Sequence, residues 1–246
     1  MIPYERRNKI LNLLSKKGII NLEEFSTALN TVSESTIRRD LRILEKEGMV
    51  ENLRGGATKL LNSSFDTPIY SRKILHVDEK EKIAKTAAAL VQNGDMIYLD
   101  VGTTVIRMVK YLKHKKISIV TTDASIIQEL GDTDLNCILV GGEIIPNTAS
   151  LVGPMTDTIL KELFFDKAFL GTYGFDLKAG FSSPDIREST KKKIVKENSS
   201  QVYILADSSK EGKRSLAKSF DLDECTLITD KLSDLVKNNA NYILAE

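Results

Sequence analysis

The sequence predicts a two-domain α/β protein, in which a small domain of three helices and a β-hairpin precedes a doubly wound, mostly parallel sheet. The chain has 246 residues, which suits two domains, and its 41% hydrophobic content is enough for a proper core. Helical patterns and a glycine-marked hairpin occupy the first sixty residues, whereas later apolar runs alternate with amphipathic segments. We expect the domains to span residues 1–58 and 75–246, joined by a linker over 59–74.

Two short helices are predicted over residues 4–18 and 22–30. In both stretches apolar residues repeat three, four or seven positions apart, which places them on one helix face. The first stretch ends at Gly18 and the second at Asn30, and both residue types tolerate the left-handed conformation that a tight turn needs.

A third helix is predicted within residues 32–48, VSESTIRRDLRILEKEG. Ser33 is its expected cap, because a serine hydroxyl accepts a hydrogen bond from a free N–H of the first turn. Ile37, Leu41 and Leu44 share one side of this helix and should be buried. The opposite side presents Ser35, Arg38, Arg39 and Arg42.

A β-hairpin follows in the stretch MVENLRGGATKLL, where two extended runs flank glycines that supply positive φ. Three helices with such a hairpin form a winged helix-turn-helix, whose third helix enters the major groove of DNA. There arginines meet phosphates or guanine edges, hydroxyls bond phosphates or bases, and Arg54 at the wing tip reaches a minor groove or phosphate. The predicted DNA-binding residues are Ser33, Ser35, Thr36, Arg38, Arg39, Arg42 and Arg54.

Net charge alone, at +1, does not indicate a nucleic-acid partner. Residues 1–60 contain 11 Lys and Arg against 8 acidic residues, which is a weak excess. An arginine-rich helix face is often only a solvated surface. The complete pattern of three helices and a hairpin favours DNA binding here.

From residue 78 onward, continuous apolar runs of four to six residues alternate with amphipathic helices, one of them VIRMVKYLK. Such runs are typical of parallel strands that helices cover on both faces. The predicted strands lie in DMIYLD, ISIVTT, NCILVGG, KAFLGT, QVYILAD, CTLIT and NYILA.

Three stretches follow predicted strands, at the carboxyl edge where such sheets bind ligands. DVGTT combines Gly102 with the hydroxyls of Thr103 and Thr104, and the N–H groups of the next predicted helix favour an anion. VGGE contains Gly141, and DSSK ends in the ammonium group of Lys210. Together these groups suit a phosphate or a sugar phosphate.

The motifs of other ligand classes are missing from the sequence. There is neither a G-x-x-x-x-G-K-[ST] motif nor a G-x-G-x-x-G motif, so nucleoside triphosphates and dinucleotides are poor candidates. The two cysteines and two histidines do not lie at metal-ligand spacing. We therefore predict no cofactor, no metal ligand and no catalytic residue.

The residues of the first domain resemble the DeoR family of bacterial sugar-metabolism repressors. VSESTIRRDLRILEKEG followed by RGGA is similar to the family signature V-S-x-x-T-[IV]-R-R-D-L-x-x-L with a wing ending in H-G-G-A, and Arg54 replaces the usual His. The resemblance continues through YLDVGTT, LVGGE, DKAFLGTYGFDLKAGFSSPDIRES, VYILADSSKEG and LITD, so it covers nearly the whole chain.

The resemblance implies a sensor domain similar in fold to ribose-5-phosphate isomerase. It implies that Gly102, Thr103 and Thr104 hold a sugar phosphate and that Lys210 pairs with it. The implied residues around the sugar are Asp100, Gly141, Asp176, Glu188 and Lys192. Four departures lie in or beside this pocket: Val101, Thr122, Ser189 and Glu211 stand where the family often has Ser, Asn, Ala and Phe. FLGTYGFD…AGFSSPD is nearest to family members that answer to fructose-1-phosphate.

We expect a homo-oligomeric transcriptional repressor of a sugar-utilisation operon, with double-stranded operator DNA and a phosphorylated sugar as partners. One alternative is a phosphosugar isomerase-like enzyme with an appended DNA-binding domain, in which Asp176, Glu188 and Lys192 would act on the sugar. Against this, DIRESTKKKIVKEN contains no clear counterpart of the glycine-rich segment that carries the isomerase base. A second alternative, an architectural DNA binder that senses no sugar, leaves the α/β domain without a task.

We expect the chain to stay in the cytoplasm and to have no membrane partner. No apolar run approaches the roughly 18 residues of a membrane span, and the N-terminal MIPYERRNKI lacks the apolar core of a signal peptide.

Overall fold

The computed structural model describes residues 1–60, 69–131 and 133–246. The chain forms two compact units, Met1–Val77 and Asp78–Glu246, which are described separately.

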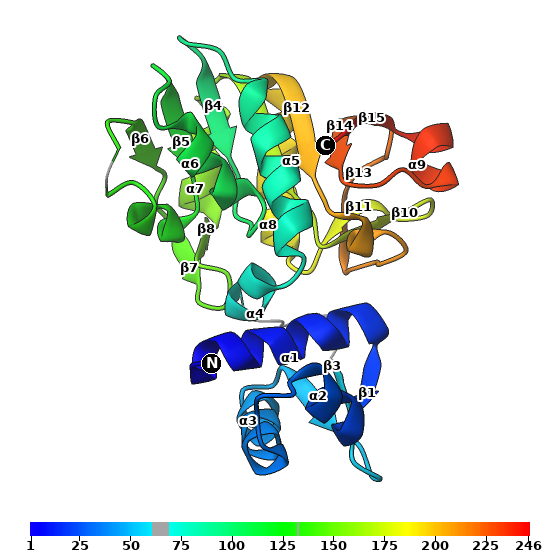
Figure 1. The fold of residues 1–246 in the computed structure, drawn as a ribbon. Helices are drawn as coiled ribbons and strands as arrows, with labels where there is room; N and C mark the ends of the chain where they lie inside the picture. The colour runs from blue at the N-terminus through cyan, green and yellow to red at the C-terminus, as the bar shows by residue number, and fades with distance from the viewer. Residues whose placement is uncertain (61–68, 132) are drawn as a thin grey trace. The chain divides into compact units, whose positions relative to one another are not determined.

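The N-terminal unit contains three helices, a small sheet and a short fourth helix (Figure 1). In chain order these are α1 (Pro3–Lys17), β1 (Ile19–Asn21), α2 (Leu22–Ala28), α3 (Glu34–Lys46), β2 (Val50–Asn52), β3 (Ala57–Leu60) and α4 (Ile69–Ile74). The antiparallel strands have the order β1-β3-β2. The predicted three helices and hairpin are therefore confirmed, and the unpredicted β1 makes the hairpin a three-stranded sheet.

The residues of the predicted linker, 59–74, fall into three groups. Residues 59 and 60 belong to β3, residues 61–68 lie outside the described residues, and residues 69–74 form α4. Ile74 and Leu75 pack against the N-terminal core, partly buried. Because of this apolar contact, the first unit extends well past the expected boundary at residue 58.

The apolar side of α3 packs as its periodicity predicts, with Ile37, Leu41 and Leu44 at most 5% exposed. The same side also buries Asp40, which is 2% exposed. The Arg6 guanidinium on α1 pairs with this carboxylate and donates to both of its oxygens. The pair ties the first helix to the third.

Replacing Asp40 by asparagine should destabilise the N-terminal unit, because the charge of Arg6 then loses its partner. A partly buried pair broken from one side costs about 2–3 kcal/mol of the free energy of unfolding. Native-state hydrogen exchange at the amides of Leu41 and Leu44 measures this loss. Glu34→Gln on the same helix is the control, since Glu34 is exposed and its removal should leave those rates unchanged. Equal rates in Asp40→Asn and the wild type would contradict the prediction.

The C-terminal unit is built on a seven-stranded sheet of order β15-β14-β12-β9-β4-β5-β6, with every neighbouring pair parallel. The strands are β4 (Met96–Leu99), β5 (Ser118–Thr121), β6 (Asn136–Leu139), β9 (Phe165–Gly171), β12 (Ser199–Leu205), β14 (Thr226–Thr229) and β15 (Asn241–Leu244). All seven coincide with the predicted apolar runs.

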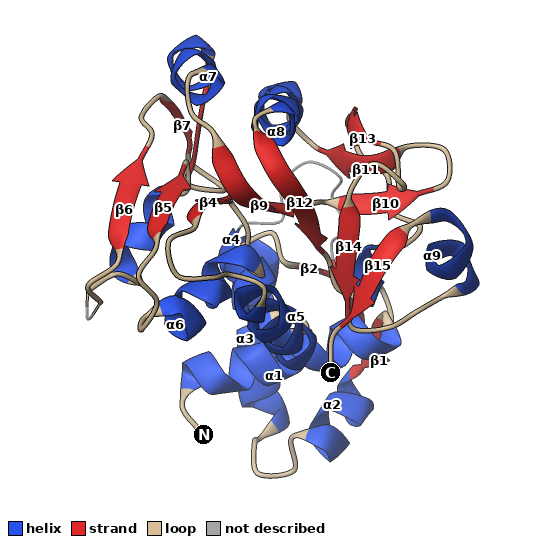
Figure 2. Ribbon diagram, turned by 90° about the horizontal axis from the view of Figure 1, so that it is seen from above, coloured by secondary structure: helices blue, strands red, loops and turns tan. Residues whose placement is uncertain are grey.

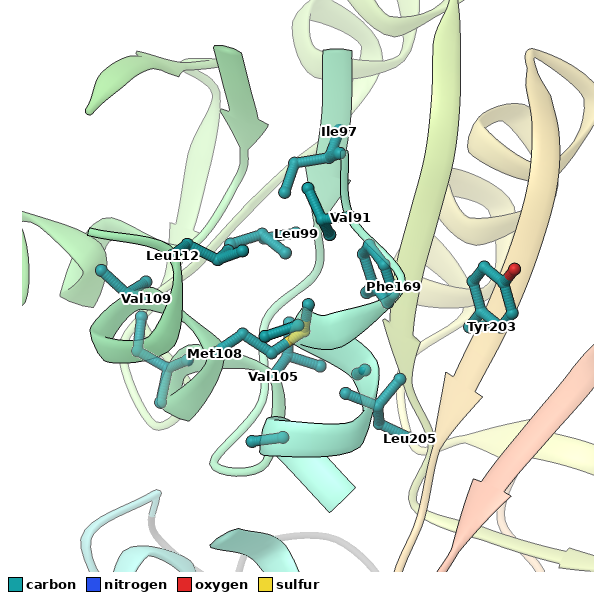
Figure 3. Packing of buried hydrophobic residues seen from close by; sticks show 14 of the residues in the cluster. Val91, Ile97, Leu99, Val105, Met108, Val109, Leu112, Phe169, Tyr203 and Leu205 are labelled. Carbon is teal, nitrogen blue, oxygen red and sulfur yellow. The ribbon is translucent and has the colours of Figure 1, made fainter. Parts of the chain in front are cut away.

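Helices cover both faces of this sheet, as Figure 2 shows. One face packs against α5 (Val77–Ala89), the 3₁₀ helices η1 (Val105–Met108) and η2 (Ala124–Gln128), and α6 (Val109–Leu112). The other packs against α7 (Pro154–Lys161), α8 (Ile186–Glu197) and α9 (Asp234–Asn239). Side chains alternate between the two cores, so that Leu99 faces the first and Tyr98 the second. Figure 3 shows part of the first core, where Leu99, Phe169 and Leu205 come from neighbouring strands. The doubly wound prediction is confirmed.

Two features of this unit differ from expectation. The helix predicted in VIRMVKYLK is a four-residue 3₁₀ helix, η1, followed by a single α turn, α6. Five short antiparallel strands were also not predicted: β7 (Glu143–Ile145), β8 (Ser150–Val152), β10 (Gly174–Asp176), β11 (Gly180–Ser183) and β13 (Ala217–Phe220). None of these short stretches is a continuous apolar run, so the pattern that marks the parallel strands does not mark them.

Within the described residues, no helix combines the length and the apolar character needed to cross a membrane.

Candidate functional site

The first candidate surface is the outward face of α3. The Ser33 hydroxyl caps this helix by accepting from the N–H of Thr36 at 3.4 Å, and it lies 2.8 Å from the Thr36 hydroxyl. The side chains at Ser35, Arg38, Arg39 and Arg42 are exposed, and Thr36 is half-buried. The predicted polar face is therefore present and solvent-accessible, with the Ser33 hydroxyl already engaged in the cap.

One arginine of this face has an acidic neighbour. Arg38 donates through Nη2 to Glu34 Oε1 at 2.8 Å, one helical turn away. Both side chains are more than half exposed, so the pair is worth little in water. A phosphate competes readily for the same guanidinium.

One hydrogen bond joins the wing to α3, and a second lies within the hairpin. Glu45 Oε1 accepts from the backbone N–H of Asn52 at 2.9 Å, and this bond lowers the pKa of Glu45. Asn52 Oδ1 accepts from the Thr58 hydroxyl at 2.8 Å across the hairpin. The turn itself uses Gly55 and Gly56 at φ +94° and +84°, as predicted. The exposed Arg54 therefore sits on a turn whose base is fixed to the recognition helix.

The second candidate site lies where the strand order of the large sheet reverses. The chain runs from β4 through β5 and β6 to one edge, then from β9 through β12, β14 and β15 to the other. The reversal point falls between β4 and β9, where ligands of open α/β sheets bind. Asp100 follows β4 directly and is fully buried, and its Oδ2 accepts from the N–H of Gly171 at the end of β9, at 3.1 Å.

Two side chains of α8 complete a buried charged cluster around Asp100. The ammonium of Lys192 donates to Asp100 Oδ2 and lies 3.7 Å from Glu188 Oε2. Burial alone lowers the pKa of Lys192, but the two carboxylates outweigh it and raise that pKa above the ordinary value. Of the nine predicted effector residues, Asp100, Glu188 and Lys192 are thus brought into direct contact.

The segment from Gly102 to Thr104 lies immediately beyond this cluster. Thr103 and Thr104 are each 8% exposed, and the chain turns here into η1. Asp123, at the end of β5, adjoins the same segment. Burial raises the pKa of Asp123, while hydrogen bonds from Ser125 and from the N–H of Gly102 act in the opposite direction. Because η1 is short, hydroxyls and backbone N–H groups matter here more than a helix dipole.

The remaining predicted effector residues lie further out. Gly141 follows β6 and is exposed, and its carbonyl accepts from the Thr156 hydroxyl at 2.8 Å. Lys210 follows β12 in η3 (Ser208–Lys210), with its Nζ 5.8 Å from the centre of the Tyr173 ring. Since β12 is two strands from β4, their ends are about 10 Å apart.

Asp176 belongs to the small antiparallel sheet, where it accepts from the backbone N–H groups of Lys178 and Ala179 and pairs with Arg214 at 2.6 Å. The bond from Ala179 has the largest effect and lowers the pKa of Asp176, and Arg214 lowers it further. These partners lie in the turn between β10 and β11 and at Arg214, outside the Asp100 cluster.

Comparison with known proteins decides the family. A model of the DeoR-like helix-turn-helix domain matches residues 6–63, and a model of the DeoR C-terminal sensor domain matches residues 75–231. The chain belongs to the DeoR family. This DeoR-family chain is 34% identical over 240 residues to a transcriptional regulator of Bacillus subtilis named FruR, covering 97% of this chain and 95% of that protein.

Other relatives of this DeoR-family protein carry similar names. The regulator GlpR of Haloferax volcanii is 32% identical, covering 95% of this chain and 92% of the relative. A lactose phosphotransferase system repressor of Staphylococcus epidermidis is 33% identical, covering 96% and 95%. These relatives are regulators and repressors, so the chain is a transcriptional regulator, and the isomerase-like alternative is set aside.

Among the solved structures that match part of this chain is ribose-5-phosphate isomerase A from Methanocaldococcus jannaschii, at 21% identity and a TM-score of 0.41, covering 55% of this chain and 54% of that one.

Four polar residues beside the Asp100 cluster were not among the predicted site residues: Tyr98, Thr122, Ser150 and Lys191. Lys191 is fully buried, and its ammonium donates to the hydroxyls of Thr122 and Ser150, each at 2.9 Å. The Tyr98 hydroxyl lies 2.9 Å from that of Thr122, and burial followed by the charge of Asp100 raises the pKa of Tyr98 well above its ordinary value. The three consecutive lysines 191–193 are typical of a solvated surface, so the sequence gives no sign that Lys191 is buried. The apolar run before Thr122 does indicate burial.

The described part of the chain contains no group of three or more His, Cys, Asp and Glu side chains placed to hold a metal ion.

Proposed function

We propose that this DeoR-family regulator represses a sugar-utilisation operon and that a phosphorylated sugar controls its affinity for operator DNA. Fructose-1-phosphate is the first effector to test. The name of one relative, the lactose phosphotransferase system repressor of S. epidermidis, supports the sugar-related role.

The DNA-reading part of the proposal rests on the face of α3. Its exposed arginines stand on a capped helix whose opposite side is buried, which is the geometry that presents side chains to a major groove. Ser35 and Thr36 lie in the first turn of α3, where recognition helices approach the bases. In this proposal the exposed Arg54 of the wing contacts the DNA backbone beside the groove.

One observation carries the effector part of the proposal, namely the buried cluster of Asp100, Lys192 and Glu188 at the reversal point of the sheet. Carboxylates accept hydrogen bonds from sugar hydroxyls, and an ammonium donates to sugar oxygens. The adjoining segment from Gly102 to Thr104 offers backbone N–H groups and hydroxyls to a phosphate, with Lys210 and Gly141 on the same sheet edge. In this proposal Asp176 contributes from the β10–β11 hairpin.

The effector acts by binding one arrangement of the protein more tightly than the other, since equal affinity for both shifts no equilibrium. Paired recognition helices match repeated half-sites, so the proposal includes a homo-oligomer.

Fluorescence anisotropy of a labelled DNA fragment from upstream of this protein's own gene tests the proposal. The measurement is made at fixed salt, with and without a panel of sugar phosphates. Release by one phosphosugar, but not by its unphosphorylated parent, supports the proposal and names the inducer. Tight binding that no member of the panel changes would contradict the effector part and leave the DNA-reading part standing.

Replacing Lys210 by alanine should weaken the response to the effective phosphosugar about tenfold, because one charge-assisted bond to the phosphate is lost. DNA affinity without sugar should not change. Lys237→Ala serves as the control, because Lys237 is an exposed lysine of the same unit, on α9. An effector titration identical to that of the wild type would remove Lys210 from the site.

A further inference from the structure

Lys191 is a fully buried ammonium group beside the candidate effector site. Its Nζ donates to Thr122 Oγ1 and Ser150 Oγ, each at 2.9 Å, and to the carbonyl of Leu151 at 3.4 Å. All three acceptors are neutral oxygens. Asp100 Oδ1 lies 4.0 Å from the same Nζ, beyond hydrogen-bond distance. Consecutive lysines of α8 thus approach the two oxygens of one carboxylate, and only Lys192 forms a hydrogen bond with it.

The acceptors of Lys191 belong to segments that come together only in the folded unit. Thr122 directly follows β5, whereas Ser150 and Leu151 belong to β8. The backbone joins the same segments, because the Leu151 N–H donates to the Thr122 carbonyl at 2.8 Å and the Ala124 N–H to the Ala149 carbonyl at 2.9 Å. The β7–β8 hairpin, residues 143–152, follows directly after Gly141 and Gly142. Lys191 therefore joins the end of one parallel strand, β5, to the hairpin that follows a predicted effector residue.

A lysine at this place needs a reason, because burying an ammonium costs free energy and a methionine would fill the same space without that cost. Hydrogen bonds in three directions fix the relative position of the segments more specifically than apolar contact does. Asp100 Oδ1 accepts no hydrogen bond from any residue that the structure describes. A buried acceptor left in this state gains from a ligand hydroxyl that donates to it.

We infer that Lys191 is a positioning residue of the effector site, which holds the β7–β8 hairpin against the end of β5, next to the Asp100 carboxylate that follows β4. It thereby sets the place of Gly141 relative to the Asp100 carboxylate. That the site binds a phosphosugar rests on the proposed function, whereas the contact between Lys191 and the hairpin does not.

Hydrogen exchange on the full chain without ligand tests the positioning role directly. We expect the amides of Ala124 and Leu151 to exchange about tenfold faster in Lys191→Met, because three bonds to the ammonium are lost. Thr122→Val, which keeps the shape and removes one acceptor, should show a smaller change of the same kind. Thr122→Ser keeps the hydroxyl and should behave as the wild type does. Thr190→Val removes a neighbouring hydroxyl of α8, one that is exposed and donates to the Ile186 carbonyl, and should leave the hairpin unaffected.

Calorimetric titration with fructose-1-phosphate measures the affinity of the effector site, which a purely structural role of Lys191 would leave unchanged. Affinity should fall about tenfold in Lys191→Met and should be preserved in Thr190→Val. Amides of β9 and β12 should keep their exchange rates, which separates a local effect from general destabilisation.

Unchanged exchange at Ala124 and Leu151 in both Lys191→Met and Thr122→Val would overturn the inference. Equal acceleration of amide exchange in all strands would overturn the inference as well, because Lys191 would then stabilise the unit in general and not position the hairpin. If fructose-1-phosphate fails to bind the wild type, the proposed effector is wrong, and hydrogen exchange still decides the role of Lys191.

Discussion

Replacing Arg38 and Arg39 together by alanine should abolish specific binding to operator DNA. Both guanidinium groups are exposed on the outward face of α3, and each contact with a guanine edge is worth about 1–3 kcal/mol, which is tenfold or more in affinity. Anisotropy titration of the labelled operator fragment measures the loss. Each single variant should lose about tenfold, and binding of the effector should not change.

The salt dependence of the single variants identifies what each arginine contacts. Loss of a phosphate contact lowers the slope of log affinity against log salt by about one, whereas loss of a base contact reduces discrimination between sequences. Lys17→Ala is the matched control, because Lys17 is an exposed cation of the same unit that pairs with Glu24 at the end of α1. Wild-type operator affinity in the double variant would contradict the proposed use of α3.

Asp100→Asn should destabilise the C-terminal unit strongly. Asp100 is fully buried, and the substitution leaves the ammonium of Lys192 with Glu188 alone, 3.7 Å away. Breaking a buried pair from one side costs about 3–5 kcal/mol. Urea unfolding followed by circular dichroism measures this change. The double variant Asp100→Asn with Lys192→Met should recover about half of the loss, because it removes both charges.

A second carboxylate–lysine pair lies at the opposite end of β4, which it joins to β9, and provides the control. Asp95 pairs with Lys167 at 2.7 Å, and both side chains are 12% exposed. Water reaches this pair, so Asp95→Asn should cost no more than about 1–2 kcal/mol. The prediction fails if the Asp95 and Asp100 variants lose equal stability.

The parts of the fold that the sequence predicts are those with a repeated signal. The seven parallel strands are continuous apolar runs, and α3 combines a capping serine with three apolar residues at helical spacing. Strands such as β1 and β7, with three residues each, have no such repeat. Their pairing depends on partners distant in the chain, which local patterns do not identify.

The same limit applies to the candidate site. Asp100 and Thr103 follow a strand directly, so their place at the sheet edge is predictable from the chain order. The burial of Lys191 and Lys192 is not predictable from the chain order, because α8 buries these two lysines and leaves the neighbouring Lys193 exposed. Asp40 was missed for the same reason, since its burial depends on Arg6, on another helix.

The difference between the interior of each parallel strand and the segment that follows it bears on how such a regulator changes its ligand preference in evolution. Strand interiors such as Tyr98 and Leu99 pack the two cores, whereas several proposed effector residues lie in the short segments just beyond the strand ends. Half-buried positions of those segments, such as Val101 and Ser208, can change at less cost to the sheet than the buried Asp100. Under the proposed function, grafting the segments 101–104 and 208–210 from one family member into another, with Asp100 and Asp207 kept, should give a regulator with a new inducer.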